Sequence, residues 1–435
     1  MSIDAAQLKG FYKTMRRLRM VEEDGAMSLA SEPARFNFKA ASRDRLASPK
    51  QERRPSFDVV PNANLCAWNA AGYYVCEYTD DTYWVLDRLD NVGPLYGYKA
   101  YAYNSTGAGV RAYVVDSGVW YGHYELQGRV EAGANMTIDP QATDPNDVTN
   151  EEDPIPADYS PANDPCNRTT ASGLWGYTTH GTSVASLIGG TTTGVAKDVT
   201  LIPVKVISCV NAEGSKLATA RGLDWIQNDM AGRSGRAVVN MSMFYDTAST
   251  DGTHLCEDGA GGWVNCISAI ENEVSAIVGS NIVFVTSANN QGNGNCTTSP
   301  ARMGYGGSFP APNRPITAGA STYTNTNGTY TDSNWAGTNP SNFGSCVSIW
   351  APGSRLRIAV TTGANDYFQQ DAGGSSYASA ITSGVVARLL QRYPTLSSVG
   401  VWNALVSRAN GRYGVPDFDP SATVNTKLVY ISHAE

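Results

Sequence analysis

The sequence of 435 residues lacks several features that would place it in other protein classes. No apolar run approaches the roughly 18 residues that a membrane-spanning helix needs. There is no basic surplus, because 32 Lys and Arg stand against 40 Asp and Glu, a net charge of −8. No cysteines form a CxxC pair, which removes support for a zinc site or a thioredoxin-like motif. Since phosphate backbones are bound by positive surfaces, we expect neither nucleic acid nor a membrane as a partner.

Positive charge is concentrated near the N-terminus. Residues 1–57 hold 12 Lys and Arg against 7 Asp and Glu, a net of +5, and the remaining residues hold 20 against 33, a net of −13. A basic segment on an acidic body is either a solvated tail or a segment that docks electrostatically, as a pro-segment does. Apolar residues at helical spacing predict an amphipathic helix over residues 4–31.

Cysteine usage favours an oxidising compartment. The even count suits four disulfides. The cysteines are Cys66, Cys76, Cys166, Cys209, Cys256, Cys266, Cys296 and Cys346. N-x-S/T sequons at Asn104, Asn135, Asn167, Asn240, Asn295 and Asn327 are typical of a secreted glycoprotein, although Asn240 lies in a strand expected to be buried. The first 20 residues show no apolar core of a signal peptide. We give the cysteines more weight and expect a secreted protein.

Strand and helix patterns alternate from about residue 109. Apolar runs predict buried strands at 111–119, 199–207, 236–244 and 280–288, and helical spacing predicts helices at 217–230 and 376–393. This alternation predicts an α/β fold with a predominantly parallel sheet, flanked by helices on both faces and preceded by an N-terminal extension. Residues 131–176 and 245–266 are expected to be polar insertions.

Two polar residues stand where an α/β domain places its chemistry. Asp116 closes a buried strand, and ligands of open parallel sheets bind at that end. His180 precedes a Gly-Thr turn and a predicted helix, whose N-terminal dipole disfavours the imidazolium and suits a neutral base. Taken singly, Asp116 is better explained as a loop cap or helix N-cap, and His180 as a surface histidine near a helix cap.

Ser376 and Asn289 complete a catalytic set. Ser376 follows two glycines and opens a long helix, so its hydroxyl is expected to be exposed and its N–H to point at an incoming oxyanion. Asn289 ends another strand, where its amide can donate to the same oxyanion. Their ordinary explanations are a helix N-cap and a turn-forming asparagine. Together, the four residues supply a nucleophile, a base, an orienting carboxylate and an oxyanion donor in the order Asp, His, Ser, one of the known orders of a catalytic triad.

Three motifs in this order carry a family resemblance. The motifs AYVVDSGV at 112–119, HGTSVAS at 180–186 and GSSYAS at 374–379 resemble those of the subtilisin-like serine proteases (peptidase S8), in particular the proteinase K and aqualysin branch. The resemblance covers roughly residues 83–430. It implies a subtilisin-like serine endopeptidase in which Asp116 orients His180, His180 acts as base and then acid, and Ser376 attacks the scissile carbonyl. Asn289 would stabilise the oxyanion together with the Ser376 N–H.

The resemblance also implies polypeptide substrates, bound as an added strand between two edge segments. The residues expected to contact substrate are Gly214, Ser215, Lys216, Ser242, Met243, Phe244, Thr286, Ser287 and Ala288. Phe244 and Tyr245 replace a glycine pair usual in the family, and we expect them to narrow the cleft. Ala288 replaces a glycine and is expected to restrict large side chains.

Disulfides and a structural ion follow from the same resemblance. It implies the pairs Cys166–Cys209 and Cys296–Cys346, which leaves Cys66–Cys76 and Cys256–Cys266. No cofactor is expected for catalysis. Asp87, Asp90 and Asn91 match a family ligand cluster, and they predict either a structural calcium site or an ordinary charged stretch.

Residues 1–80 are expected to be a pro-region that assists folding, inhibits the cleft and is removed, ahead of a monomeric peptidase domain over 81–435. Alternatively, this region stays attached to the mature body. Two other functions stay open at this point. One is a catalytically silent peptide-binding protein on a protease scaffold. The other is a carboxylate-based hydrolase of glycosides that uses Asp116 and Glu125 as an acid/base pair.

Overall fold

The computed structural model describes residues 26–29, 66–69, 73–77, 83–91, 100–137, 154–155, 175–207, 214–246, 255–257, 263–265, 269–294, 297–305, 313–326, 329–334, 340–360, 368–409 and 427–432. Within these ranges, no helix combines the length and the apolar character required to cross a bilayer.

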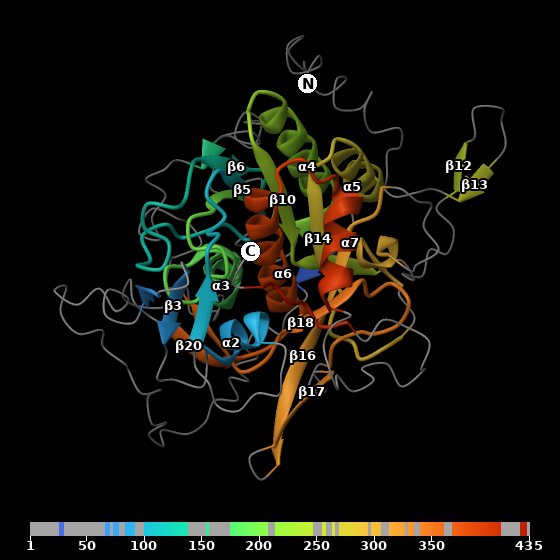
Figure 1. Ribbon diagram of the computed structural model, residues 1–435. Helices are drawn as coiled ribbons and strands as arrows, with labels where there is room; N and C mark the ends of the chain where they lie inside the picture. Colours follow the sequence, from blue (N-terminus) through green and yellow to red (C-terminus); the bar gives the residue numbers. More distant parts are fainter. Residues whose placement is uncertain are drawn as a thin grey trace, which may run out of the picture.

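Seven parallel strands form the centre of the protein (Figure 1). Six follow in the order β6 (Gly133–Asn135), β8 (Thr200–Lys205), β5 (Val110–Asp116), β10 (Arg236–Met241), β14 (Val283–Ser287) and β16 (Ile316–Thr326), and the seventh, β18 (Ile349–Pro352), pairs with β16. Antiparallel strands extend both ends: β7 (Pro154–Ile155) beside β6, and β17 (Thr329–Asn334) beside β16. The predicted α/β fold with a predominantly parallel sheet is confirmed. The expected insertion at 131–176 nevertheless contributes β6 and β7 to the sheet.

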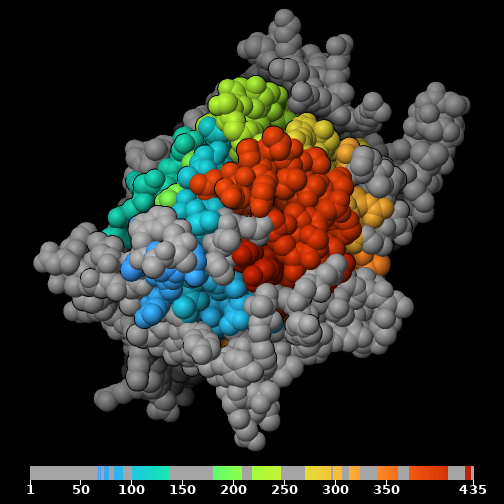
Figure 2. Space-filling model, in the orientation of Figure 1, coloured from blue at the N-terminus to red at the C-terminus, as the bar shows by residue number. Residues whose placement is uncertain are grey.

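Helices cover both faces of this sheet. One face packs against α3 (Trp175–Gly189) and α6 (Ser375–Arg392), and the other against α4 (Lys216–Ala231) and α5 (Ala269–Gly279). Figure 1 shows α6 in front of β10 and β14, with α7 (Ser398–Ala409) beside it. In Figure 2 the orange-red residues towards the C-terminus cover much of the visible face.

Neighbouring residues along a strand point into two different hydrophobic cores, one on each face of the sheet. Val114 and Val238 join the cluster that contains α3 and α6, whereas Tyr113, Val239 and Phe284 join the cluster that contains α4 and α5. Strands buried on both faces are continuous apolar runs rather than alternating ones. This is why the sequence predicts them well.

Smaller sheets surround the main one. They consist of β2 (Cys66–Trp68), β3 (Tyr74–Glu77) and β4 (Ala100–Tyr103); β1 (Ala26–Leu29), β9 (Gly214–Ser215), β11 (Met243–Asp246) and β15 (Thr298–Ser299); β12 (Leu255–Glu257) and β13 (Trp263–Asn265); and β19 (Leu356–Ala359) and β20 (Phe368–Ala372). The helices α2 (Trp84–Asp90) and η4 (Ala301–Met303) complete the set. The helix predicted over 4–31 is wrong for residues 26–29, whose backbone pairs with two edge segments instead. The rest of that prediction lies outside the described residues.

The hairpin before residue 80 shares a sheet with a strand that follows it. β3 pairs antiparallel with β4 over four residues, and Cys76 of β3 is fully buried in the same core as α3 and α6. The rings of Tyr74 and Tyr103 stack across this pair of strands, with their centroids 5.8 Å apart. The expected division at residue 80 therefore separates elements that pack together, and it stays a prediction.

Candidate active site

Asp116 lies at the carboxyl end of β5, between β8 and β10, as the sequence predicts. Its side chain is fully buried, and Oδ1 accepts a hydrogen bond from the Ser117 N–H at 2.7 Å. This end of a parallel sheet is where ligands of such folds bind. The carboxylate is thus fixed at the expected edge.

His180 faces Asp116 from helix α3. Its Nδ1 lies 2.9 Å from Oδ1 and 2.8 Å from Oδ2 of Asp116, and both side chains are buried. Its Nε2 is buried too, and within the described part of the chain it has no hydrogen-bond partner. The carboxylate therefore holds the ring in one orientation and leaves the second nitrogen available.

The start of α3 differs from the expectation. The helix begins at Trp175, so His180 lies in its second turn, beyond the first turn in which the macrodipole acts. A close approach fixes the ring instead. A Cβ at Gly181 would lie 2.2 Å from the carbonyl oxygen of Gly118, so only glycine lets α3 come this near to the loop after β5.

Ser376 is the second residue of α6, close to the start predicted for this helix. It is fully buried, and its Oγ donates a hydrogen bond to the carbonyl oxygen of Ser242 at 3.1 Å. The expectation of an exposed hydroxyl is therefore wrong, because the hydroxyl turns inward onto that carbonyl. The ring of the next residue, Tyr377, lies 6.0 Å from the His180 ring, so the start of α6 adjoins the histidine.

A buried polar network holds the start of α6 against the end of β10. The Oγ of Ser242 donates to the Ser376 carbonyl at 3.1 Å, and it lies 2.8 Å from Ser379 Oγ. Asn240 Nδ2 donates to Ser242 Oγ at 2.8 Å, and Ser383 Oγ donates to Asn240 Oδ1 at 3.0 Å. Because these buried groups satisfy one another, the network fixes the backbone around the serine. The burial expected for the sequon at Asn240 is confirmed.

Asn289 follows β14 in a left-handed conformation, with φ of 75°. Its Oδ1 accepts the Asn290 N–H at 2.5 Å, while its Nδ2 is buried without a partner among the described residues. Asn290 was not predicted from the sequence. Its Oδ1 accepts the Ser375 N–H at 2.9 Å and so ties this loop to α6. The pair Asn289–Asn290 directly after a predicted strand was the sequence feature that could have indicated this role.

The two expected edge segments flank a third strand. β9 and β11 both pair antiparallel with β1, through Met27 opposite Gly214 and Ser28 opposite Phe244. Two of the predicted strand residues fall outside: Lys216 opens α4, and Ser242 precedes β11. Both edge segments therefore pair with one strand of this chain, and their contact with substrate stays a prediction.

The predicted walls of the cleft are mostly buried. Thr286 and Ser287 end β14, and Thr286 Oγ1 donates to the Met241 carbonyl at 3.0 Å. The N–H of Ala288 donates to the Ala318 carbonyl at 2.9 Å. Met243 is fully buried and Phe244 is half-buried.

Tyr245 does not narrow the cleft as expected. Its side chain is buried in the core beneath α4 and α5, and its backbone pairs with Ser299 of β15. The strand alternation turns Tyr245 inward where Phe244 points the other way. Of the two bulky residues, only Phe244 is placed to shape the cleft.

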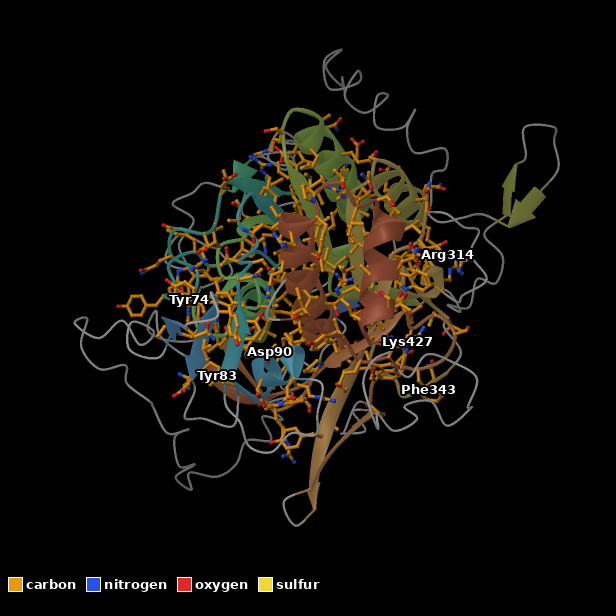
Figure 3. All side chains as sticks on the ribbon, viewed as in Figure 1. Tyr74, Tyr83, Asp90, Arg314, Phe343 and Lys427 are labelled. Atoms are coloured by element: carbon orange, nitrogen blue, oxygen red, sulfur yellow. The ribbon has the colours of Figure 1, made fainter. Side chains whose placement is uncertain are left out.

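A buried carboxylate, Asp87, and a half-buried one, Asp90, mark the predicted calcium cluster on α2. Asp87 and Asp90 are three residues apart and so share a helix face. Burial raises the pKa of each to about 7, and for Asp90 the nearby Asp87 adds to the increase. Figure 3 labels Asp90 in the same part of the view as Tyr74 and Tyr83.

Carboxylate and amide oxygens are suitable ligands for calcium, but Asp87, Asp90 and Asn91 together provide fewer oxygens than a calcium ion needs. Asp90 Oδ2 accepts the Ala102 N–H at 2.6 Å, and the carbonyl of Asn91 accepts from Arg88 at 2.9 Å. Calcium takes six to eight oxygen ligands. No group of three or more His, Cys, Asp or Glu side chains in the described ranges is placed to hold a metal. Backbone carbonyls and water would have to complete the shell.

Glu125, the second carboxylate of the glycoside-hydrolase alternative, is occupied by other hydrogen bonds. It is fully buried and accepts hydrogen bonds from Thr192 and Thr193, at 2.8 Å from one N–H and 3.0 Å from the other. Burial alone would raise the pKa of Glu125, but the hydrogen bonds from these threonines outweigh it and lower the pKa. The glycoside-hydrolase alternative thus loses its second carboxylate.

The cysteines agree with the expected oxidised state where the structure describes them. Cys76 and Cys346 are disulfide-bonded, and Cys66 lies directly opposite Cys76 in the register of β2 and β3. Cys256 lies in β12. Cys166, Cys209, Cys266 and Cys296 lie outside the described residues, so their pairings stay predictions.

Comparisons with known proteins identify a family and several relatives. The model of the Subtilase family (peptidase S8) matches residues 107–425. An extracellular serine proteinase of Thermus sp. (strain Rt41A) is 33% identical over 74% of this chain and 60% of its own length. The alkaline serine exoprotease A of Vibrio alginolyticus is 31% identical over 83% of this chain and 51% of its own. The chain therefore spans about half to three fifths of these relatives.

A solved structure shares the fold. The crystal structure of a cold adapted subtilisin-like serine proteinase superposes with a TM-score of 0.57 at 30% identity, covering 81% of this chain and 98% of that chain. Sphericase matches with a TM-score of 0.55 at 18% identity.

Proposed function

This chain belongs to the subtilase family, and from that membership we propose that it is a serine endopeptidase that cleaves peptide bonds through an acyl-enzyme. One observation carries most weight. His180 Nδ1 lies on the buried Asp116 carboxylate, and Nε2 of the same ring is buried without a partner in the described part of the chain. A base oriented in this way is what a serine nucleophile requires.

The proposed roles follow from the contacts. With the Nδ1–H donated to Asp116, the lone pair of His180 lies on Nε2 and accepts the Ser376 proton. The Ser376 hydroxyl must first leave the Ser242 carbonyl, a rotation about one side-chain bond. Its Oγ then attacks the scissile carbonyl carbon. His180 passes the proton to the leaving amine, and water releases the acyl group by the reverse sequence.

Asn289 would stabilise the charge that develops. Its Nδ2 donates no hydrogen bond within the described residues, so it is available to an oxyanion next to the first turn of α6. The Ser376 N–H would be the second donor. The tie between Asn290 and Ser375 supports this role, because it holds the two donors in one frame.

Substrate, compartment and ions are part of the same proposal. Polypeptide substrates would lie as a strand between β9 and β11, which already pair with β1. The N-terminal extension would act as a pro-region, and its strand in the cleft supports a zymogen. Secretion is supported by the relative named an extracellular proteinase. We propose a monomer with no catalytic cofactor, and Asp87, Asp90 and Asn91 as contributors to a structural calcium site.

A fluorophosphonate probe tests the function. We expect wild type, freed of its N-terminal segment, to be labelled at Ser376 and to cleave casein. Ser376→Ala and His180→Ala should abolish both, whereas the neighbouring Ser375→Ala should keep labelling. Mapping the adduct by mass spectrometry separates the adjacent serines.

One observation favours a second candidate, a catalytically silent peptide-binding protein. The Ser376 hydroxyl donates to Ser242 rather than to His180 in this structure. Folded protein that binds peptides in the cleft but resists the probe after the N-terminal segment is removed would establish this alternative and contradict the peptidase proposal.

A further inference from the structure

Phe244 lies on the face of β11 that is turned away from the core. Its neighbours Met243 and Tyr245 are buried in the cluster beneath α4 and α5, whereas Phe244 is half-buried. Because successive side chains of a strand point to opposite faces, the phenyl ring lies on the other face of this edge segment. The ring therefore has apolar surface that a chain bound along the edge can cover.

The strand that pairs with β11 defines the backbone position that faces this ring. Strand β1 is antiparallel to β11, with Ser28 opposite Phe244 and Leu29 opposite Met243. Residues directly opposite each other in such a pair have Cβ atoms about 4.5–5.5 Å apart. Phe244 is only half-buried although a residue of β1 lies opposite it, and that residue is a serine. A larger apolar side chain at the same position would bury more of the ring.

The same register gives the direction of a chain bound to this edge. Ser376 Oγ donates to the carbonyl oxygen of Ser242, the residue that precedes β11. The step from Ser28 to Leu29 along β1 is a step from Phe244 to Met243 along β11, and so a step towards Ser242. A substrate that runs in the same direction therefore places the residue opposite Phe244 on the N-terminal, acyl side of the bond that reaches Ser376.

From these observations we propose that Phe244 determines substrate specificity at one position. It favours polypeptides that carry an aromatic or large apolar side chain opposite the ring, on the acyl side of the scissile bond. The inference rests on the proposed peptidase function and defines a substrate class for the same site. The contact depends on the side chain at 244, because glycine at this position would offer the substrate only backbone.

The alternation of side chains limits this preference to a single substrate position. The substrate residues on either side of it point to the opposite face of the bound strand, away from the ring. Phenylalanine should be preferred over serine at this one position by roughly two- to tenfold in kcat/KM, the range expected for a cross-strand aromatic pair. Since the contact is the same in the bound substrate and in the transition state, the preference should appear in KM rather than in kcat.

The experiment is a competition between paired peptides, cleaved in one mixture by enzyme obtained from expression of the full chain. Each pair differs only by phenylalanine or serine at one acyl-side position, several positions are tested in turn, and mass spectrometry identifies the bond cut. The ratio of the two rates does not depend on the amount of active enzyme. We expect wild type to prefer phenylalanine at one position, and Phe244→Gly to bring that ratio close to one without changing the others. Tyr74→Gly, which removes a half-buried aromatic ring from another strand, β3, should keep the wild-type ratio.

Phe244→Leu keeps the test decisive if Phe244→Gly does not fold, as shown by loss of fluorophosphonate labelling. It retains an apolar side chain, so it should still prefer leucine over serine at the same position and lose the additional preference for phenylalanine. Equal ratios in wild type and in the folded variants would overturn the inference and leave the peptidase proposal intact. Folded wild type that cleaves no peptide and takes no label contradicts the peptidase proposal itself.

Discussion

At the scale of single residues, two buried atoms are central to the proposed chemistry. His180 Nε2 and Asn289 Nδ2 lack a hydrogen-bond partner in the described part of the chain, although buried polar groups are normally paired. Leaving such groups unpaired costs about 1–3 kcal/mol each. In the proposed reaction the Ser376 hydroxyl would pair with Nε2 and the substrate oxyanion with Nδ2, so this cost becomes a contribution to binding the transition state.

Asn289→Gly isolates the proposed oxyanion donor. Glycine keeps the left-handed backbone at φ of 75° and removes only the amide, whereas alanine would add strain. We expect kcat to fall about 10²–10³-fold, the loss known for removing one oxyanion donor in subtilisin, with little change in KM. Steady-state hydrolysis of a peptide amide measures it.

Asn281→Gly is the matched control for this change. Asn281 also has a positive φ, of 65°, and its Oδ1 accepts the Ser398 N–H at 3.0 Å, away from the site. This variant should lose stability and keep kcat. A similar fall in kcat for both variants would remove Asn289 from the oxyanion site.

Lys197 should make stability depend on pH in the alkaline range. Burial lowers its pKa to about 7, while its Nζ donates to the Thr192 carbonyl at 2.8 Å. Between about pH 7 and the model-peptide pKa of about 10.4, the unfolded chain binds a proton that the folded chain does not. The free energy of unfolding therefore rises with pH there, by up to about 1.36 kcal/mol per pH unit.

The test compares Lys197→Met with its parent, both carrying Ser376→Ala to prevent self-digestion. Urea unfolding at pH 7, 8, 9 and 10 should show the parent gaining stability relative to the variant as pH rises. A constant difference between the two proteins would mean that Lys197 stays charged inside the fold.

At the scale of elements, helices α3 and α6 carry the proposed base, His180, and the proposed nucleophile, Ser376. They pack directly on each other, and Gly384 of α6 sits where a Cβ would lie 2.6 Å from the Cβ of Val195 and 3.1 Å from the Ile188 carbonyl oxygen. The close approach of α6 to the end of α3 and to the segment that follows it therefore depends on the missing side chain at this position.

Gly384→Ala should push the helices apart. We expect a loss of about 1–3 kcal/mol in stability, the usual cost of overpacking, and a fall in kcat because His180 and Ser376 move relative to each other. Chemical unfolding and peptide hydrolysis measure the two effects. Gly232→Ala is the control, since its nearest neighbour is the Asp229 carbonyl oxygen at 3.6 Å. If Gly384→Ala behaves like Gly232→Ala, this contact does not set the geometry.

The helices and strands that could be predicted from the sequence are those whose residue pattern lies within one short segment. Strands β5, β8, β10 and β14 are apolar on both faces, and α6 has its glycines and its helical spacing within one segment. Strand β1 was mistaken for helix, because its partners lie about two hundred residues away in β9 and β11. Distant pairing overrides local spacing.

The same limit applies inside the site. Asp116, His180 and Asn289 were recognisable from strand ends and motifs, and the structure brings Asp116 and His180 into contact. That the Ser376 hydroxyl would turn to Ser242, or that Tyr245 would enter the core, depends on backbone positions in other elements. A linear pattern contains no information on those positions.

At the scale of the whole molecule, the distribution of charge along the chain favours the same pairing that β1 makes with β9 and β11. The segment that includes β1 carries a net charge of +5 and the rest of the chain −13, so long-range attraction favours the strand in the cleft. Attraction between exposed charges weakens over about 8 Å at physiological ionic strength. Backbone pairing, which salt does not screen, must therefore provide most of the specificity.

Calcium should reverse the effect of Asp87→Asn on stability. Burial raises the pKa of Asp87 to about 7, so the folded state binds a proton that the unfolded state has lost above its usual 3.8, and stability falls as pH rises through this window. At pH 8 without calcium the ionised, buried carboxylate is therefore unfavourable, and Asp87→Asn should raise the Tm.

With calcium at 100 times its Kd, a site that exists only in the folded protein adds about 2.7 kcal/mol to the parent. Asp87→Asn, which loses a charged ligand, should gain much less, so that the order of the two Tm values reverses. Both proteins carry Ser376→Ala, and scanning calorimetry with EDTA and with calcium measures the effect. Asp224→Asn, on α4 and bonded to Asn228, controls for the change in net charge. A reversal confined to Asp87→Asn assigns the ion to α2, and equal gains in all three proteins would contradict a site there.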